Sequence, residues 1–184
     1  MLQSNPTKTT FSLPATDGRM ISSESFTGSK GLIVIFTCNH CPTAVAYEER
    51  IKAIQKKAAE SGIQLLAISS NDTARFPQDD FANMKIRASQ KGFLFPYCFD
   101  ESQEIAKNFG AERTPHAFLL NSRMEIIYSG SIDDNAENPN AVQEKFLENS
   151  MIELLDGRGI SKSKTQAVGC TIKWKQTGSV ATGI

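Results

Sequence analysis

The sequence has little of what would hold a chain together covalently or place it in a membrane. Among its 184 residues are four cysteines and one tryptophan, and the longest unbroken apolar run covers only residues 32–36. A membrane span needs about 18 consecutive apolar residues, and four cysteines are too few for a disulfide scaffold in a chain of this length. We therefore expect one globular domain that buries about 70% of its unfolded surface and folds without metal or disulfides.

The chain also lacks an excess of charge, because 20 lysines and arginines balance 20 aspartates and glutamates. Without a net field, neither nucleic acid nor a membrane surface is an expected partner. The N-terminal residues contain no apolar stretch of the kind found in secretory signals, so we expect a cytoplasmic protein. In that reducing compartment cysteines are thiols by default, and any pairing between them is transient and catalytic.

Positive charge is nevertheless concentrated at one end. Residues 157–184 contain no acid and five basic residues: Arg158, Lys162, Lys164, Lys173 and Lys175. This segment therefore carries a charge of +5, and residues 1–156 carry −5 to give the total of zero. We expect a basic tail that packs on, or trails from, an acidic domain formed by residues 1–156.

The apolar pattern predicts an α/β fold. A buried strand at residues 32–37 precedes a helix with apolar residues spaced by three and four positions from Ala44 to Ala58, and a second strand follows at 63–69. Short joins between these elements imply a right-handed parallel βαβ unit. Glu48 and Lys52 are expected to form an ion pair on the wet face of the helix.

The other predicted elements follow the same kind of pattern. A hairpin around Asp17-Gly18 lies in an N-terminal extension (1–31), and an insertion after the second core strand (71–98) carries a helix. A short helix from Asp100 to Gly110, a hairpin at 116–128 and a last helix starting at Asn138-Pro139 complete the domain. Asp133 and Asp134 are expected to be solvated loop acids.

The tetrapeptide Cys38-Asn39-His40-Cys41 lies where the first strand gives way to the helix. Unpaired N–H groups at a helix N-terminus stabilise a thiolate, and two cysteines at this spacing can close a disulfide. If Cys38 is the N-cap, it is the activated thiol; if Cys41 is the N-cap, Pro42 takes its preferred first helical position and Cys41 is activated. An imidazolium at His40 would stabilise the Cys38 thiolate.

Metal binding is the rival use of these cysteines. Zinc takes four ligands, and no second C-x-x-C or H-x₃-H pattern accompanies the first. We therefore expect no metal. Cys98, in an apolar segment, is expected to be a small buried side chain.

The element order and motifs resemble the thioredoxin superfamily and, more closely, the peroxiredoxin-like branch of the redoxin (alkyl hydroperoxide reductase/thiol-specific antioxidant) family. The resemblance covers about residues 9–175 and rests on the segments FSLPATDG, FTCNHCPTAVAYEERI, FPYCFDESQEIAKNFGA, TPHAFLL, SGSIDD and GCTIKWK. It implies a thioredoxin-like fold, a three-layer α/β/α arrangement with a central mixed sheet.

The resemblance also implies roles for individual residues. In thioredoxin-like proteins the first cysteine of the motif, here Cys38, is the nucleophile and the second, here Cys41, resolves; their disulfide is the redox group and no cofactor is needed. Thr114-Pro115 would form the cis-proline loop that contacts substrate, although an X-Pro bond on its own is usually trans. In peroxiredoxins the cysteine that attacks peroxide precedes a proline, as Cys41 precedes Pro42.

Departures from the peroxiredoxin pattern disfavour an efficient peroxidase. Val34 and Cys38 stand where those enzymes have a proline and a threonine or serine. Pro115 stands where their peroxide-orienting arginine falls, and Arg113 is only a loose substitute. The strand before the motif also lacks the buried acid of thioredoxins, which leaves the proton acceptor for Cys41 unidentified.

Three functions follow from this pattern. The first is a thiol–disulfide oxidoreductase acting on a protein or small-molecule disulfide and reduced by a thiol donor. The second is an antioxidant peroxidase in which Cys41 is oxidised and then resolved by Cys38 or Cys170. The third is a non-catalytic module that holds a metal or a partner through the same loop. Cys170 is either a lightly packed surface thiol, in a tail anchored by Trp174, or a third redox thiol.

Overall fold

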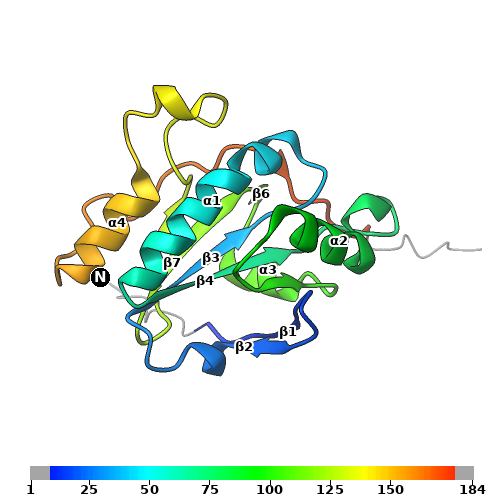
Figure 1. Cartoon of the computed structure of the whole chain (residues 1–184), viewed down its shortest axis with the longest axis horizontal. Coiled ribbons are helices and arrows are strands. Elements are labelled where there is room, and N and C mark those ends of the chain that lie inside the picture. Colours follow the sequence, from blue (N-terminus) through cyan, green and yellow to red (C-terminus); the bar gives the residue numbers. More distant parts are fainter. Residues whose placement is uncertain (1–8, 177–184) are drawn as a thin grey trace, which may run out of the picture.

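Five strands form the sheet at the centre of the fold (Figure 1). The structure is a computed structural model that describes residues 9–176. The strands are β3 (Gly31–Phe36), β4 (Ile63–Ser69), β5 (Tyr97–Phe99), β7 (His116–Asn121) and β8 (Ile126–Gly130), in the spatial order β5-β4-β3-β7-β8. β3, β4 and β5 are parallel, whereas β7 and β8 are antiparallel to their neighbours. The sheet is therefore mixed, as predicted.

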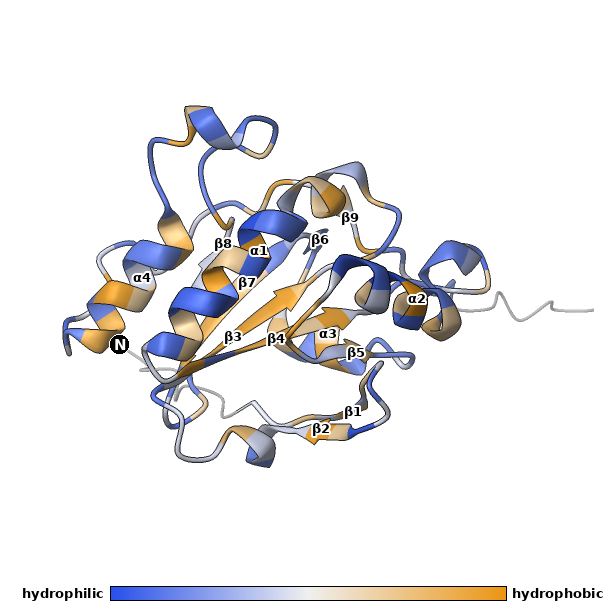
Figure 2. Ribbon diagram, in the orientation of Figure 1, coloured by the Kyte–Doolittle hydropathy of each residue, from blue (hydrophilic) through white to orange (hydrophobic). Residues whose placement is uncertain are grey.

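Alternation along β3 divides the core into two layers. Ile33 and Ile35 pack with α1 (Pro42–Glu60), α2 (Phe81–Lys91) and α4 (Phe146–Leu155) on one face of the sheet. On the other face Leu32, Val34 and Phe36 pack with α3 (Glu104–Phe109) and the N-terminal hairpin. Figure 2 shows apolar strands between these layers. This arrangement confirms the three-layer α/β/α fold.

The N-terminal hairpin covers the second face. β1 (Ser12–Pro14) and β2 (Met20–Ser22) pair antiparallel around the predicted turn, where Gly18 has a φ of +89°. A short 3₁₀ turn, η1 (Ser23–Phe26), follows and buries Phe26. This extension therefore supplies apolar side chains to the core.

The insertion after β4 carries η2 (Pro77–Asp79) and α2 before it returns to the sheet as β5. Asp80 caps α2 by accepting a hydrogen bond from the Asn83 N–H at 2.8 Å. This packing corrects the expectation for Glu48. Its side chain is buried against α2, where it accepts a hydrogen bond from Arg87 Nε at 2.5 Å, while Lys52 pairs with Glu49 instead.

The last helix begins later than predicted. Asn138-Pro139 opens only a 3₁₀ turn, η3 (Pro139–Ala141), in which the Asn138 side chain accepts from the Asn140 N–H. The chain then runs extended beside Asp134, which accepts from the Gln143 N–H, and α4 starts at Phe146. The prediction was wrong because the capping signals are used by a single turn.

Asp133 is also not the solvated acid that the sequence suggested. It is buried and accepts hydrogen bonds from the Tyr47 hydroxyl at 2.7 Å and from Arg50 Nη1 at 2.8 Å. Arg50 in turn donates to the backbone oxygens of Asn135 and Ala136, so this network fastens the loop after β8 to α1.

The described part of the basic tail returns over the domain. Its residues 163 and 165 exchange backbone hydrogen bonds with Ser129. Further on, β9 (Cys170–Thr171) pairs antiparallel with β6 (Arg113–Thr114) beside the Cys38–Cys41 loop. Among residues 9–176 no helix combines the length and apolar character needed to cross a membrane.

Candidate active site

The loop between β3 and α1 places both motif cysteines in the core. α1 starts at Pro42, with Cys41 as its N-cap in an extended conformation. Of the two helix starts that the sequence left open, the structure has the one in which proline occupies the first helical position, where its missing N–H costs nothing. Cys41, and not Cys38, therefore receives the field of the helix N-terminus.

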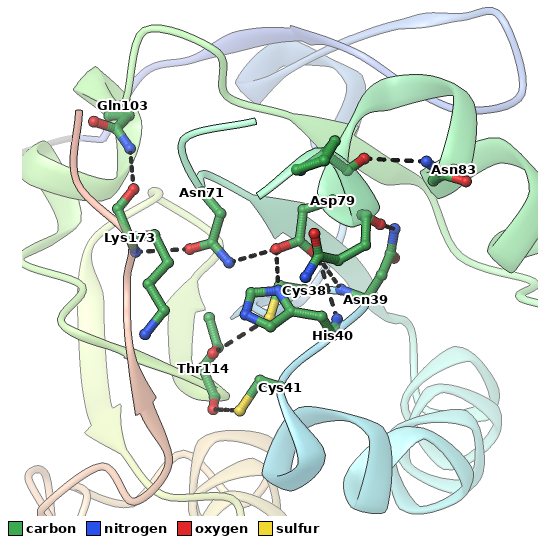
Figure 3. A network of polar contacts seen from close by, with 12 residues as sticks. Cys38, Asn39, His40, Cys41, Asn71, Asp79, Asn83, Gln103, Thr114 and Lys173 are labelled. Carbon is green, nitrogen blue, oxygen red and sulfur yellow. Dashed lines mark hydrogen bonds and ion pairs between the residues drawn. The ribbon is translucent and has the colours of Figure 1, made fainter. Parts of the chain in front are cut away.

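The two sulfurs are buried and share a neighbour. Cys38 is 3% exposed and Cys41 is fully buried. In their thiol forms, Cys38 Sγ donates to the Thr114 hydroxyl at 3.5 Å and Cys41 Sγ donates to the Thr114 carbonyl oxygen at 3.3 Å. The Thr114–Pro115 peptide bond is cis, as the family resemblance implies. The structure thus brings the two predicted parts of the site together (Figure 3).

The surroundings favour a thiolate on Cys41. The Cys38 thiol, as a proton donor toward Cys41, is the strongest influence that lowers the pKa of Cys41, and the Cys170 thiol and the Ala44 N–H lower it further. The same proton sharing, burial and the negative charge of Asp79 raise the pKa of Cys38. The pair therefore holds its proton on Cys38.

A buried carboxylate from the insertion organises the motif loop. Asp79 is fully buried, and its Oδ1 accepts from the backbone N–H groups of Asn39 at 2.7 Å and His40 at 3.2 Å. Its Oδ2 accepts from His40 Nδ1 at 2.5 Å and from Asn71 Nδ2 at 2.8 Å. Four N–H donors thus satisfy this carboxylate, which is what a buried charge requires.

No sequence motif marks Asp79, which lies just before the helix of the insertion, as a residue of the site. Its hydrogen-bond partners Asn39 and His40 lie about 40 positions earlier in the chain, so no local spacing connects them. A single acid that enters a site from a loop has no periodic pattern, and only the packing of the insertion shows its role.

The two central residues of the motif are fixed against the same insertion. The ring of His40 stacks on Phe76, with centroids 5.3 Å apart. Asn39 Nδ2 donates to the Gln78 carbonyl oxygen at 2.9 Å, and Asn39 Oδ1 accepts from the Tyr97 hydroxyl at 3.0 Å. Both side chains therefore hold the loop in place.

One group in the described residues could in principle hold a metal ion. Cys38, His40 and Asp79 place their donor atoms within 4.8 Å of one another. They supply three of the four ligands that zinc usually takes, and His40 and Asp79 are already hydrogen-bonded to each other. The absence of a resident metal therefore stays a prediction, to be checked by metal analysis of the purified protein.

Two other cysteines have different surroundings. Cys170 lies opposite Thr114 in the β6–β9 pair, and its half-buried side chain packs against Cys38, Cys41 and Ala44. Cys98 is fully buried in the core below β1, and this burial raises the pKa of its thiol to about 12. The prediction of a small buried side chain at Cys98 is confirmed.

Comparison with known proteins agrees with this fold. Residues 3–145 match the Redoxin family. An uncharacterized conserved protein from Geobacillus kaustophilus is similar in structure, with a TM-score of 0.87 and 30% identity, over 93% of this chain and 92% of that chain. A hypothetical protein from Sinorhizobium meliloti 1021 has a TM-score of 0.86 and 30% identity, over 95% and 96% of the two chains. No curated protein matches the sequence.

A more distant neighbour shares the fold. A putative thiol:disulfide interchange protein from Chlorobium tepidum has a TM-score of 0.62 at 18% identity, over 84% of this chain and 99% of that chain. The family match spans most of the sequence, and the thioredoxin-like fold agrees with it. This protein therefore belongs to the Redoxin family of thioredoxin-like redox proteins.

Proposed function

We propose that the protein is a thiol–disulfide oxidoreductase that cycles between the Cys38/Cys41 dithiol and a Cys38–Cys41 disulfide. The observation that carries this proposal is the placement of both sulfurs against one residue, Thr114, with Cys41 at the N-cap of α1. Such a pair can exchange disulfides without any cofactor, because one sulfur is stabilised as a thiolate and the other lies beside it.

In the proposed reaction the Cys41 thiolate attacks one sulfur of a substrate disulfide and expels the first substrate thiolate. Cys38 then loses its proton and attacks Cys41 Sγ, which expels the second substrate thiolate and leaves the Cys38–Cys41 disulfide. These roles are the reverse of those that the family resemblance suggests. The reason is that the proton shared by the two thiols stays on Cys38, whose pKa is raised further by burial and by the negative charge of Asp79. The helix N-terminus adds to the effect of the Cys38 thiol in lowering the pKa of Cys41.

The His40–Asp79 pair is the proposed acceptor for the Cys38 proton. Its donor atoms lie within 4.8 Å of the Cys38 sulfur, and Asp79 is joined to His40 by a hydrogen bond. This pair would supply the function of the buried acid that the strand before the motif lacks. A carboxylate that orients an imidazole beside a thiol is a general arrangement for moving a proton.

The proposed substrate is a protein or small-molecule disulfide, and the proposed reductant is a thiol. From the balanced charge of the chain we infer no nucleic-acid or membrane partner. We also propose a cytoplasmic setting, where the reducing conditions would keep the cysteines as thiols between reaction cycles. The reaction needs no resident metal.

The test is thiol trapping with peptide mass mapping across a series of glutathione redox buffers. We expect Cys38 and Cys41 to pair reversibly at a defined potential, and Cys41→Ser to abolish turnover of a disulfide substrate. Cys98→Ala, which alters a cysteine outside the site, is the matched control. If Cys38 and Cys41 never pair, the proposal is wrong, and the loop becomes a candidate metal or partner site instead.

A peroxidase is the second candidate, favoured by the Cys41-Pro42 start of α1. The Cys41 thiolate would attack a peroxide O–O bond, release hydroxide or an alkoxide, and become a sulfenic acid, which Cys38 would convert into the disulfide with loss of water. Arg113 offers this reaction little, because its Nη1 donates to the Gly169 carbonyl oxygen at 3.1 Å. Peroxide consumption no faster than that of an ordinary thiol would exclude this function.

A further inference from the structure

Three sulfurs meet at the site, and they differ in their access to solvent. Cys38 and Cys41 are buried, whereas Cys170, from the tail, is only half-buried; it packs against the cluster that they form with Ala44, and its thiol interacts with Cys41. A reductant that approaches from solution therefore reaches the sulfur of Cys170 more easily than the other two. Access matters because thiol–disulfide exchange needs direct contact of the attacking thiolate with a sulfur atom.

The strand that carries Cys170 is closely fitted to the cis-proline segment. β9 pairs with β6 so that Cys170 lies opposite Thr114, and the Ile172 N–H donates to the Glu112 carbonyl oxygen at 3.0 Å. Gly169 has a φ of +148°, and a Cβ placed there would lie 2.1 Å from the Thr114 carbonyl oxygen. Only glycine permits this approach, which brings Cys170 to the two buried thiols.

The residues after Cys170 are held by the network that surrounds the motif loop. Asn71, which donates to the buried carboxylate of the site, accepts from the Lys173 N–H at 2.8 Å, and the Lys173 carbonyl oxygen accepts from the Asp72 N–H at 2.8 Å. Gln103 joins the tail at two places: it donates to the Lys173 carbonyl oxygen (Figure 3), and it accepts from the Lys175 N–H. The tail is therefore fixed by hydrogen bonds beside the motif loop and forms one side of the site.

We propose that Cys170 is a third redox thiol, which forms a disulfide with Cys41 and is the point at which an external thiol delivers electrons. This inference rests on the proposed function, because it describes how the Cys38–Cys41 disulfide is reduced. It assigns the tail a catalytic residue.

The exchange conserves atoms and electrons. The Cys170 thiolate attacks Cys41 Sγ of the Cys38–Cys41 disulfide; the Cys41–Cys170 bond forms, the Cys38–Cys41 bond breaks, and Cys38 leaves as a thiolate that takes up the proton released by Cys170. A donor thiolate then attacks Cys170 Sγ and expels the Cys41 thiolate. A second donor thiol reduces the mixed disulfide on Cys170, so that two donor thiols become one donor disulfide.

Two features of the surroundings suit this route. Cys41, whose pKa is lowered by its neighbours, is a good leaving group when the donor attacks Cys170. Burial and the neighbouring Cys41 thiolate raise the pKa of Cys170, and Lys173 and Arg113 oppose this rise only in part. The contribution of the Cys41 thiolate is absent while Cys41 is held in the Cys38–Cys41 disulfide, which is the state that Cys170 attacks.

The first test isolates the new disulfide. In the Cys38→Ser variant, oxidised glutathione should produce a Cys41–Cys170 disulfide, which peptide mass mapping identifies. In the double variant that carries both Cys38→Ser and Cys170→Ser, the same treatment should leave Cys41 glutathionylated or free. If Cys41 in the single variant stays free or glutathionylated while Cys170 stays a thiol, the inference is wrong.

The second test measures the flow of electrons. The Cys38–Cys41 disulfide of Cys170→Ser should be reduced by glutathione roughly tenfold more slowly than that of the wild type, because the donor must attack a buried sulfur. Cys98→Ala should match the wild type. Equal rates in Cys170→Ser and the wild type would overturn the inference. Failure of Cys38 and Cys41 to pair in Cys170→Ser would instead count against the proposed function, and the Cys38→Ser result would still decide the role of Cys170.

Discussion

At the residue scale, the loop that carries both thiols depends on one buried carboxylate. Asp79 accepts two backbone N–H groups of the motif and the ring N–H of His40, so it sets the shape of the loop as well as its charge. An amide at this position would turn one oxygen acceptor into a donor that faces N–H groups. The buried groups left without acceptors would then destabilise the fold.

We therefore expect Asp79→Asn to lower the free energy of unfolding by roughly 1–3 kcal/mol, the usual cost of leaving a buried polar group unpaired. Urea denaturation measures this change. Asp80→Asn is the matched control, because asparagine caps a helix as well as aspartate does. Equal stability of the two variants would show that Asp79 does not organise the loop.

Cys38 and Cys41 form a second residue-scale unit, in which one thiol stabilises the other as a thiolate. The Cys38 thiol has the largest lowering influence on the pKa of Cys41. Cys38→Ala should therefore raise the pH midpoint of thiolate formation at Cys41 by about one unit or more. Thiolate absorbance at 240 nm as a function of pH measures this midpoint, and Cys41→Ser identifies the contribution of Cys41. An unchanged midpoint in Cys38→Ala would place the main stabilisation at the helix N-terminus instead.

At the scale of elements, periodicity predicted those parts whose partners lie nearby in the sequence. The five apolar positions of the first helix, from Ala44 to Ala58, are all buried in α1, and the predicted N-terminal hairpin is present. Periodicity could not show that α2 covers Glu48 or that Asp79 enters the site, because those contacts depend on how the insertion packs. The cysteine motif was therefore visible in the sequence, while its supporting residue was not.

The β6–β9 pair offers a test of what the tail does as an element. Gly169→Ala would place a Cβ against the Thr114 carbonyl oxygen and force β9 away from β6. We expect the buried thiols Cys38 and Cys41 to react several-fold faster with a bulky aromatic disulfide reagent, because solvent access governs this exchange. Labelling followed by mass mapping measures the rate at each cysteine.

The matched control for that substitution is Gly159→Ala, at a position in the tail where an added Cβ meets no atom within 4 Å. It should leave the labelling rates at those of the wild type. If Gly169→Ala also leaves them unchanged, β9 does not restrict access to the site, and the burial of the two thiols must come from the domain itself.

At the scale of the whole molecule, the opposite charges of the domain and the tail contribute little to their association. The tail pairs with the domain through exposed contacts such as Lys162 with Glu144, and exposed pairs of this kind contribute about 0–1 kcal/mol. Its firm attachments are the backbone hydrogen bonds of Ser129, Thr165 and Lys173. The opposite charges of the tail and the domain are thus compatible with their association, but backbone hydrogen bonds hold the tail to the domain.

Stability of the whole domain should depend on the protonation of His116, which follows the cis-proline. Its Nδ1 accepts from the Glu112 N–H at 3.2 Å, and Nε2 lies 3.0 Å from the Ser129 hydroxyl, so the buried ring is neutral in the fold. Burial lowers the pKa of His116 to about 4, with Lys164 acting in the same direction and Glu112 opposing it. An unfolded chain would protonate the same histidine near pH 6.5.

Between these two pH values the unfolded state binds more protons than the folded state, so the domain loses stability as the pH falls from about 6.5 to about 4. The loss from this group should be on the order of 3 kcal/mol and should not grow below that window. His116→Gln removes the titrating group. The difference in unfolding free energy between wild type and variant, measured in urea at several pH values, therefore separates the contribution of His116 from that of the carboxylates. That difference should shrink as the pH falls through the window. Parallel curves would mean that His116 is accessible to protons in the folded protein.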